Sequence, residues 1–207
     1  HFGESCLAWM RSLPDDYMTS KQTVSYAGLF DDVGADAWYA SSVDYVKYGR
    51  LMAGTGSNRF APDAQMTRAM FVQVLYALEG APSVSGMSCP LTDAGGDWYT
   101  DAVIWAYNAG VAAGVSATKF APNEPLTREQ LVTMLYGYAS RSEQLTGGAG
   151  ALSAYRDQAN ISPWAREAMA WAVSAGIICG TSATTLSPQK IGTRAEVATV
   201  LMQFCEQ

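Results

Sequence analysis

One pattern of about sixty residues occurs three times in this chain, and a repeat of that length constrains the fold more than any other feature. Aligning the leading tryptophans superposes the copies at offsets of 60 and 66 residues. Every copy keeps the same landmarks in the same order: Asp32, Asp93 and Asp157; Trp38, Trp98 and Trp164; Gly54, Gly114 and Gly180; Phe60-Ala-Pro62, Phe120-Ala-Pro122 and Leu186-Ser-Pro188; then Thr67-Arg68, Thr127-Arg128 and Thr193-Arg194. The chain is therefore a tandem array of one structural unit.

Each copy predicts a helix, a turn-rich loop and a second helix. The first helix should begin near the tryptophan, run about eleven residues and end at Gly110 or Gly176, because glycine commonly follows a helix C-terminus. The first copy has Arg50 in this column and Gly49 before it, so its helix should end one residue earlier.

The second helix should begin at each Thr-Arg pair, where the threonine caps free backbone N–H groups. Gln130 and Glu196 complete a capping box in two copies, whereas the first copy has Met70 at that position. Apolar residues follow at helical spacing: Phe71, Val74, Leu75 and Leu78; Leu131, Met134, Leu135 and Tyr138; Val197, Val200, Leu201 and Phe204. These helices should pack together, because one two-helix unit buries too little surface alone.

The pattern predicts an all-α protein and the following division of the chain: an N-terminal extension at 1–29, repeats at 30–82, 91–141 and 155–207, a linker at 83–90, and a Gly/Ser linker at 142–154.

Composition and motifs exclude several classes of protein. The net charge of −6 disfavours nucleic acid as a partner, and no apolar run is long enough for membrane insertion. The absence of an internal histidine, a nucleophile elbow and a phosphate loop predicts that the chain is not an enzyme and has no catalytic residue. Its four cysteines form no metal-binding motif, so we expect no metal and no cofactor. They form either the pairs Cys6–Cys89 and Cys179–Cys205 or four reduced thiols.

The order of these landmarks resembles the S-layer homology (SLH) domain, and the resemblance covers residues 30–207. It implies a pseudo-threefold body with a central three-helix bundle and grooves between the repeats. It also implies an extracellular module of the bacterial surface that binds a secondary cell-wall polysaccharide, commonly one with pyruvylated sugars. The family's leading ligand contact corresponds to Arg68, Arg128 and Arg194.

The residues themselves support these arginines, because a cation in the first helical turn is unfavourable by about 0.3–1 kcal/mol and all three copies keep it. A ligand carboxylate could bind both the guanidinium group and free N–H groups at the helix start. Alternatively, each arginine pairs with Asp32, Asp93 or Asp157 and fastens the repeats together.

The other candidate ligand residues each have two interpretations. The three aspartates contact sugar hydroxyls, or they cap a helix or orient an arginine. Trp38, Trp98 and Trp164 stack on sugar rings, or they belong to the core. Gly54, Gly114 and Gly180 let a ligand approach, or they adopt a positive φ angle. Because the copies differ, three equal sites are not expected.

The competing function is a protein-binding, adhesin or self-assembly module of the cell surface, with other surface proteins as its partners.

Overall fold

A computed structural model describes residues 29–141, 145 and 149–206. The described residues form two compact bodies. The first body consists of residues 29–65 and 193–206, and the second body consists of residues 66–192. The first body therefore joins the beginning of the first repeat to the end of the third.

The described residues contain six α-helices and no strand, which confirms the all-α prediction. The first helix of each repeat is nine residues long; these helices are α3 (Ala40–Tyr48), α5 (Thr100–Asn108) and α7 (Arg166–Ser174). The second helices are α4 (Arg68–Leu78), α6 (Arg128–Ala139) and α8 (Arg194–Cys205). All twelve apolar residues predicted for the buried faces of the second helices are buried.

The threonine caps form as predicted. In all three second helices the Thr side chain accepts a hydrogen bond from the backbone N–H three residues later. Thr127 and Thr193 form the full reciprocal box with Gln130 and Glu196, and Thr67 forms only the single bond. The capping chemistry could be read correctly from four consecutive residues because it is entirely local.

The first helices all end at the same alignment column, so the prediction that α3 ends one residue early is wrong. Gly110 and Gly176 adopt φ angles of 69° and 71°, and Arg50 adopts 56° in the same column. The N–H groups of Leu51 and Met52 both donate to the carbonyl of Val46, and the other two copies show the same pattern. This turn holds Arg50 in a left-handed conformation that normally favours glycine.

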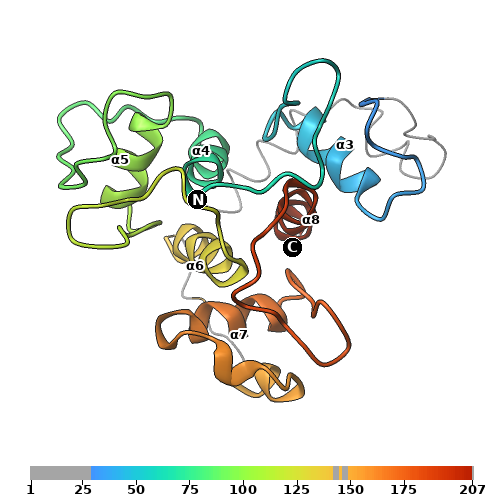
Figure 1. Ribbon diagram of the computed structural model, residues 1–207. Coiled ribbons are helices and arrows are strands. Elements are labelled where there is room, and N and C mark those ends of the chain that lie inside the picture. The colour runs from blue at the N-terminus through green and yellow to red at the C-terminus, as the bar shows by residue number, and fades with distance from the viewer. Residues whose placement is uncertain (1–28, 142–144, 146–148, 207) are drawn as a thin grey trace. The chain divides into compact units, whose positions relative to one another are not determined.

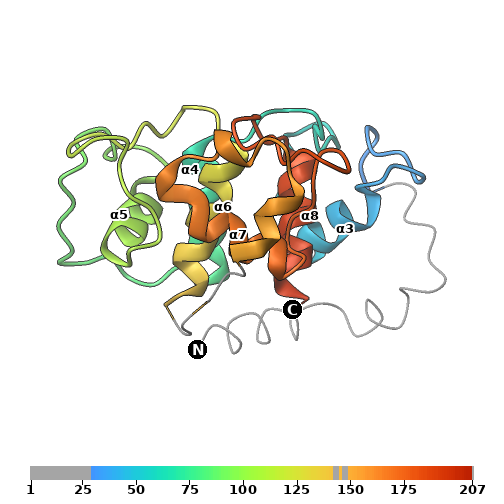
Figure 2. The same ribbon diagram turned by 90° about the horizontal axis from the view of Figure 1, so that it is seen from below.

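Helices pair between consecutive repeats rather than within one repeat. In the second body α5 packs against α4, and α7 packs against α6 (Figures 1 and 2). In the first body α3 packs against α8, the last helix of the chain. The first helix of each repeat thus contacts the second helix of the repeat before it, with α8 filling that role for α3. The expected pseudo-threefold arrangement and central three-helix bundle stay predictions.

Short 3₁₀ helices precede α7. Within the expected Gly/Ser linker, Ala149–Ala154 forms one such helix, and its Leu152 is buried. Two more follow at Gln158–Asn160 and Pro163–Ala165, the second of which contains Trp164.

The expected N-terminal extension lies almost wholly outside the described residues, as does Cys6. Cys179 is an exposed free thiol, so the expected disulfide between Cys179 and Cys205 is wrong. Among the described residues, no helix is both long enough and apolar enough to cross a membrane.

Candidate ligand-binding groove

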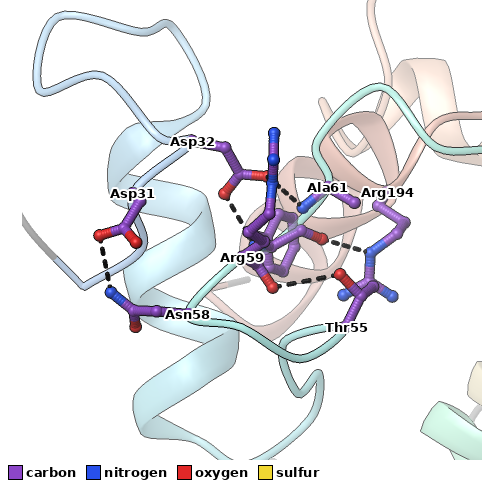
Figure 3. Close-up of polar contacts among 8 residues, drawn as sticks. Asp31, Asp32, Thr55, Asn58, Arg59, Ala61 and Arg194 are labelled. Atoms are coloured by element: carbon purple, nitrogen blue, oxygen red, sulfur yellow. Dashed lines mark hydrogen bonds and ion pairs between the residues drawn. The ribbon is translucent and has the colours of Figure 1, made fainter.

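The three arginines of the Thr-Arg pairs each bind backbone carbonyl groups of a neighbouring repeat. In each case the arginine Nε donates to the backbone carbonyl of the residue aligned with Phe60. The Nη2 atom donates to the backbone carbonyl of the residue just before the aligned glycine (Gly54, Gly114 or Gly180). The bonds are Arg68 to Phe120 (2.8 Å) and Ala113 (2.9 Å), Arg128 to Leu186 (3.1 Å) and Cys179 (3.0 Å), and Arg194 to Phe60 (2.7 Å) and Ala53 (2.6 Å). The arginines therefore do fasten repeats, but their partners are carbonyls rather than the aspartates. Figure 3 shows Arg194 in this position.

Two of these guanidinium groups are also covered by an aromatic ring. Arg68 lies 4.6 Å from the ring centroid of Phe120, and Arg194 lies at the same distance from Phe60. Burial lowers the pKa of both arginines, and the nearby carboxylates of Asp93 and Asp32 oppose that change. The third copy has Leu186 in the ring position, so Arg128 lacks this cover and is less buried.

The N–H groups at the start of each second helix already have partners, so the expected free anion site there is wrong. The N–H groups of Arg68 and Ala69 donate to the carbonyls of Glu124 and Pro122 at 3.1 and 3.0 Å. The other two helices repeat this pattern, and the threonine cap occupies the third N–H group. The loop of a neighbouring repeat thus satisfies donors that helix starts normally expose.

The three aspartates shape the loops. Each carboxylate accepts hydrogen bonds of 2.7–2.9 Å from two consecutive backbone N–H groups: Phe60 and Ala61 for Asp32, Phe120 and Ala121 for Asp93, and Leu186 and Ser187 for Asp157. The second residue of each pair has a φ angle of 52° to 59°. The carboxylate therefore stabilises a strained turn before the proline. Figure 3 shows this bond from Ala61 to Asp32.

These bonds also set the charge state of the aspartates. Burial alone would raise the pKa of each carboxyl group, but backbone hydrogen bonds, together with Arg59 beside Asp32 and Lys119 beside Asp93, outweigh it, and the pKa of all three lies below its usual value. Asp32 has a further ion pair with Arg59, at 3.5 Å. Contact between these aspartates and a sugar stays a prediction.

The three leading tryptophans are exposed, which excludes the core interpretation. Trp38 is 65% exposed, and Trp98 and Trp164 are each 57% exposed. Each lies two residues before its helix begins, so it does not belong to the buried helix face. Trp38 and Trp98 each also make a T-shaped contact with the ring of the following tyrosine, Tyr39 or Tyr99. Stacking of the three tryptophans on a sugar stays a prediction.

The glycine column serves close packing of the loop on itself. Gly54, Gly114 and Gly180 all lack a positive φ angle, so that interpretation is wrong. A Cβ atom on Gly114 would lie 2.6 Å from the Lys119 carbonyl oxygen and 2.7 Å from Leu91 Cδ2. The glycine allows the loop to fold tightly beside Arg68, which binds the carbonyl of Ala113.

The second body contains a groove of about 470 Å³ in which all three repeats take part. Three predicted ligand residues line it together, namely Arg68 from the first repeat, Gly114 from the second and Trp164 from the third. The other lining residues are Val111, Ala112, Ala113, Val115, Gln130, Thr133 and Met134. Sequence reasoning missed these, although Gln130 and Thr133 lie one turn apart on α6 and thus on one helix face.

Comparison with known proteins assigns the same repeats to one family. The sequence model of the S-layer homology domain matches residues 29–70, 90–132 and 154–198. The chain is 28% identical over 180 residues to an exoglucanase, XynX, of Acetivibrio thermocellus, which covers 86% of the chain and 16% of that enzyme.

Two surface proteins are also similar. An S-layer protein of Bacillus thuringiensis subsp. finitimus is 27% identical over 178 residues, or 86% of the chain and 21% of that protein. A surface-layer 125 kDa protein of Lysinibacillus sphaericus is 38% identical over 112 residues, or 53% of the chain and 9% of that protein. The chain thus spans about a fifth or less of the length of these relatives.

The family match covers three tandem copies and more than half of the chain, and the fold and landmarks agree with it. The chain therefore belongs to the S-layer homology domain family, and it is an anchoring module of the bacterial cell surface.

Proposed function

We propose that this module attaches its parent protein to the cell wall without a covalent bond, by binding an acidic, pyruvylated secondary cell-wall polysaccharide in grooves between repeats. The observation that carries the proposal is the groove of the second body, where a cation, an exposed aromatic face and a closely packed loop meet. Because the chain carries a net charge of −6, an acidic polymer needs such a local cationic site.

Arg68 can supply that cation while it holds the loop. Its side chain has five N–H donors, and the hydrogen bonds to the carbonyls of Phe120 and Ala113 use one each. The remaining donors can bind a carboxylate, and the low exposure of Arg68, 4%, would strengthen that bond by excluding water.

Trp164 and the polar residues of α6 complete the site. The exposed ring of Trp164 offers an apolar face to the C–H face of a sugar ring. Gln130 and Thr133 line the same groove and carry groups that can exchange hydrogen bonds with sugar hydroxyls. The site therefore suits one sugar unit that bears an acidic group.

The experiment is co-sedimentation with purified cell-wall sacculi, with and without removal of their secondary polymers. We expect the wild-type chain to bind only polymer-bearing sacculi, and Trp164→Ala to weaken that binding at least tenfold. The matched control is Tyr107→Ala, which removes an exposed aromatic residue of α5 that does not line the groove. Equal binding by stripped and intact sacculi would contradict the proposal.

An arginine variant adds a second test. Replacing Arg68 by alanine would also release the loop that it fastens, so Arg68→Lys is the better change. Lysine keeps the positive charge but loses the planar fork, and we expect weaker polymer binding. Wild-type affinity in this variant would exclude a fork-shaped contact with the polymer.

The exposed tryptophans favour one alternative function, contact with other surface proteins. Trp38 and Trp98 are exposed and do not line the groove of the second body, and exposed tryptophan is typical of protein-binding hot spots. Sedimentation velocity tests this alternative. If Trp38→Ala or Trp98→Ala alters self-association and leaves wall binding unchanged, the assembly function is favoured.

A further inference from the structure

The buried carboxylate of Glu129 has no counterpart in the other two repeats. Glu129 follows Arg128 at the start of α6 and is 2% exposed. Ala69 and Ala195 occupy the same column. A buried glutamate is costly unless hydrogen bonds satisfy it, so its presence in one copy alone requires a specific reason.

Three neutral donors of the third repeat satisfy this carboxylate. Ser162 donates twice, from its backbone N–H to Oε2 at 3.0 Å and from its hydroxyl to Oε1 at 2.7 Å. Gln189 donates its side-chain N–H to Oε1 at 2.8 Å. The negative charge is further favoured by the positive end of the α6 dipole. Glu129 thus ties α6 to the segment that leads into α7.

That segment contains Trp164, an exposed residue that lines the groove. Ser162 is the N-cap of the 3₁₀ helix Pro163–Ala165, so it lies two residues before Trp164. Gln130, Thr133 and Met134 of α6 line the same groove as Trp164. Since α6 packs against the 3₁₀ helix Pro163–Ala165 as well as against α7 (Figure 1), Glu129 links two of the elements that line the groove.

We propose that Glu129 is a positioning residue that holds Trp164 at the groove of the second body and so preorganises that groove for its ligand. The expected effect of Glu129 on affinity rests on the proposed polysaccharide-binding function. Its effect on the position of Trp164 does not depend on that function. Because the other copies have alanine, this preorganisation is particular to the groove that Arg68 lines. It makes this groove the principal binding site of the module.

Three variants test the link, two of them at Glu129 and one at Ser162. Glu129→Ala should fold, because alanine occupies the same helix position in both other repeats. Ser162→Ala removes only the hydroxyl donor and keeps the backbone bond. Glu129→Gln keeps one carbonyl oxygen for Ser162 and should have an intermediate effect. Asp101→Ala, in the first turn of α5 and exposed, is the matched control for loss of a carboxylate.

The first readout needs no ligand. The indole N–H resonance of Trp164, assigned by its loss in Trp164→Phe, should shift or broaden in Glu129→Ala and stay unchanged in Asp101→Ala. The second readout is the apparent affinity for polymer-bearing sacculi, which should fall about tenfold in Glu129→Ala. In the double variant Glu129→Ala/Ser162→Ala the loss should be smaller than the product of the two single losses.

An unchanged Trp164 resonance in Glu129→Ala would overturn the positioning role, whether or not affinity falls. A shifted resonance with wild-type affinity would overturn the claim that this groove is the principal site. If the wild-type chain itself binds no polymer-bearing wall, the proposed function fails instead, and the resonance comparison still decides the role of Glu129.

Discussion

A single buried carboxyl group should make this module more stable in weak acid than at neutral pH. Asp44 lies on the buried face of α3 and is 1% exposed, and its Oδ2 atom has no hydrogen-bond partner. Burial raises the pKa of Asp44 from 3.8 to about 7. Ile104 and Ala170 occupy the same column in the other repeats, so the fold itself does not need an acid there.

The sign of the effect follows from proton linkage. The folded state binds the Asp44 proton more tightly than the unfolded state, so the extra stability is fully present below pH 4. It is lost as the pH rises toward 7, at up to about 1.4 kcal/mol per pH unit. The whole difference between an ordinary pKa and a value of about 7 amounts to roughly 4 kcal/mol. Above pH 7 the contribution is constant.

Other groups with altered pKa values act outside this window. The pKa values of Asp32, Asp93 and Asp157 are lowered, so the stability that they contribute is present at higher pH and is lost only as the pH falls below about 4. Among the described carboxyl groups with a shifted pKa, only Asp44 therefore changes the stability between pH 5 and pH 7.

The assay is thermal unfolding of the wild-type chain and Asp44→Asn at pH 5, 6, 7 and 8. Between pH 5 and pH 7 the wild type should lose about 2 kcal/mol, or roughly 4–8 °C in Tm for a chain of this size, because Asp44 is only half titrated at pH 7. Asp44→Asn should show a much flatter profile and exceed the wild type in stability at pH 8. Parallel profiles for the two proteins would refute the reasoning, because the carboxyl group would then titrate normally.

Three further substitutions test local features. Arg50→Gly should raise the free energy of unfolding by about 1 kcal/mol, because glycine adopts the observed φ of 56° without strain; an unchanged chemical denaturation midpoint would contradict this. Thr193→Ala should cost about 1 kcal/mol by removing the α8 cap, and loss of less than a few tenths would show that the cap is not needed. Gly114→Ala should destabilise the module by about 1–3 kcal/mol through overpacking of its loop, whereas Gly95→Ala, with no atom within 4 Å of the added Cβ, should be neutral; equal effects would refute the packing argument.

Three of the ten residues that line the groove could be anticipated from local patterns. The Thr-Arg column, the glycine column and the leading tryptophan predicted Arg68, Gly114 and Trp164 as candidate ligand residues, and these three line one groove. The α6 residues Gln130 and Thr133 were not anticipated. Both belong to columns that vary between the copies, so the alignment of the repeats did not mark them.

The repeat pattern and the helix signals were sufficient to predict every second helix, its cap and its buried face. These properties depend on residues within one or two turns of each other, so the sequence of one repeat contains all the information that they require. The turn after α3 was the exception, because its hydrogen bonds to Val46 hold Arg50 in a conformation that its side chain disfavours.

The partners of these elements depended on the tertiary structure. Nothing in the local sequence shows that α5 packs on α4 of the preceding repeat, or that the guanidinium of Arg68 binds the carbonyls of Phe120 and Ala113. Every residue has a backbone carbonyl, so the residue type does not show which carbonyl accepts a hydrogen bond. Such a bond therefore cannot be predicted from the sequence. The exposure of Trp164 and the occupied N–H groups of the helix starts follow from the same long-range packing, which only the folded chain brings about.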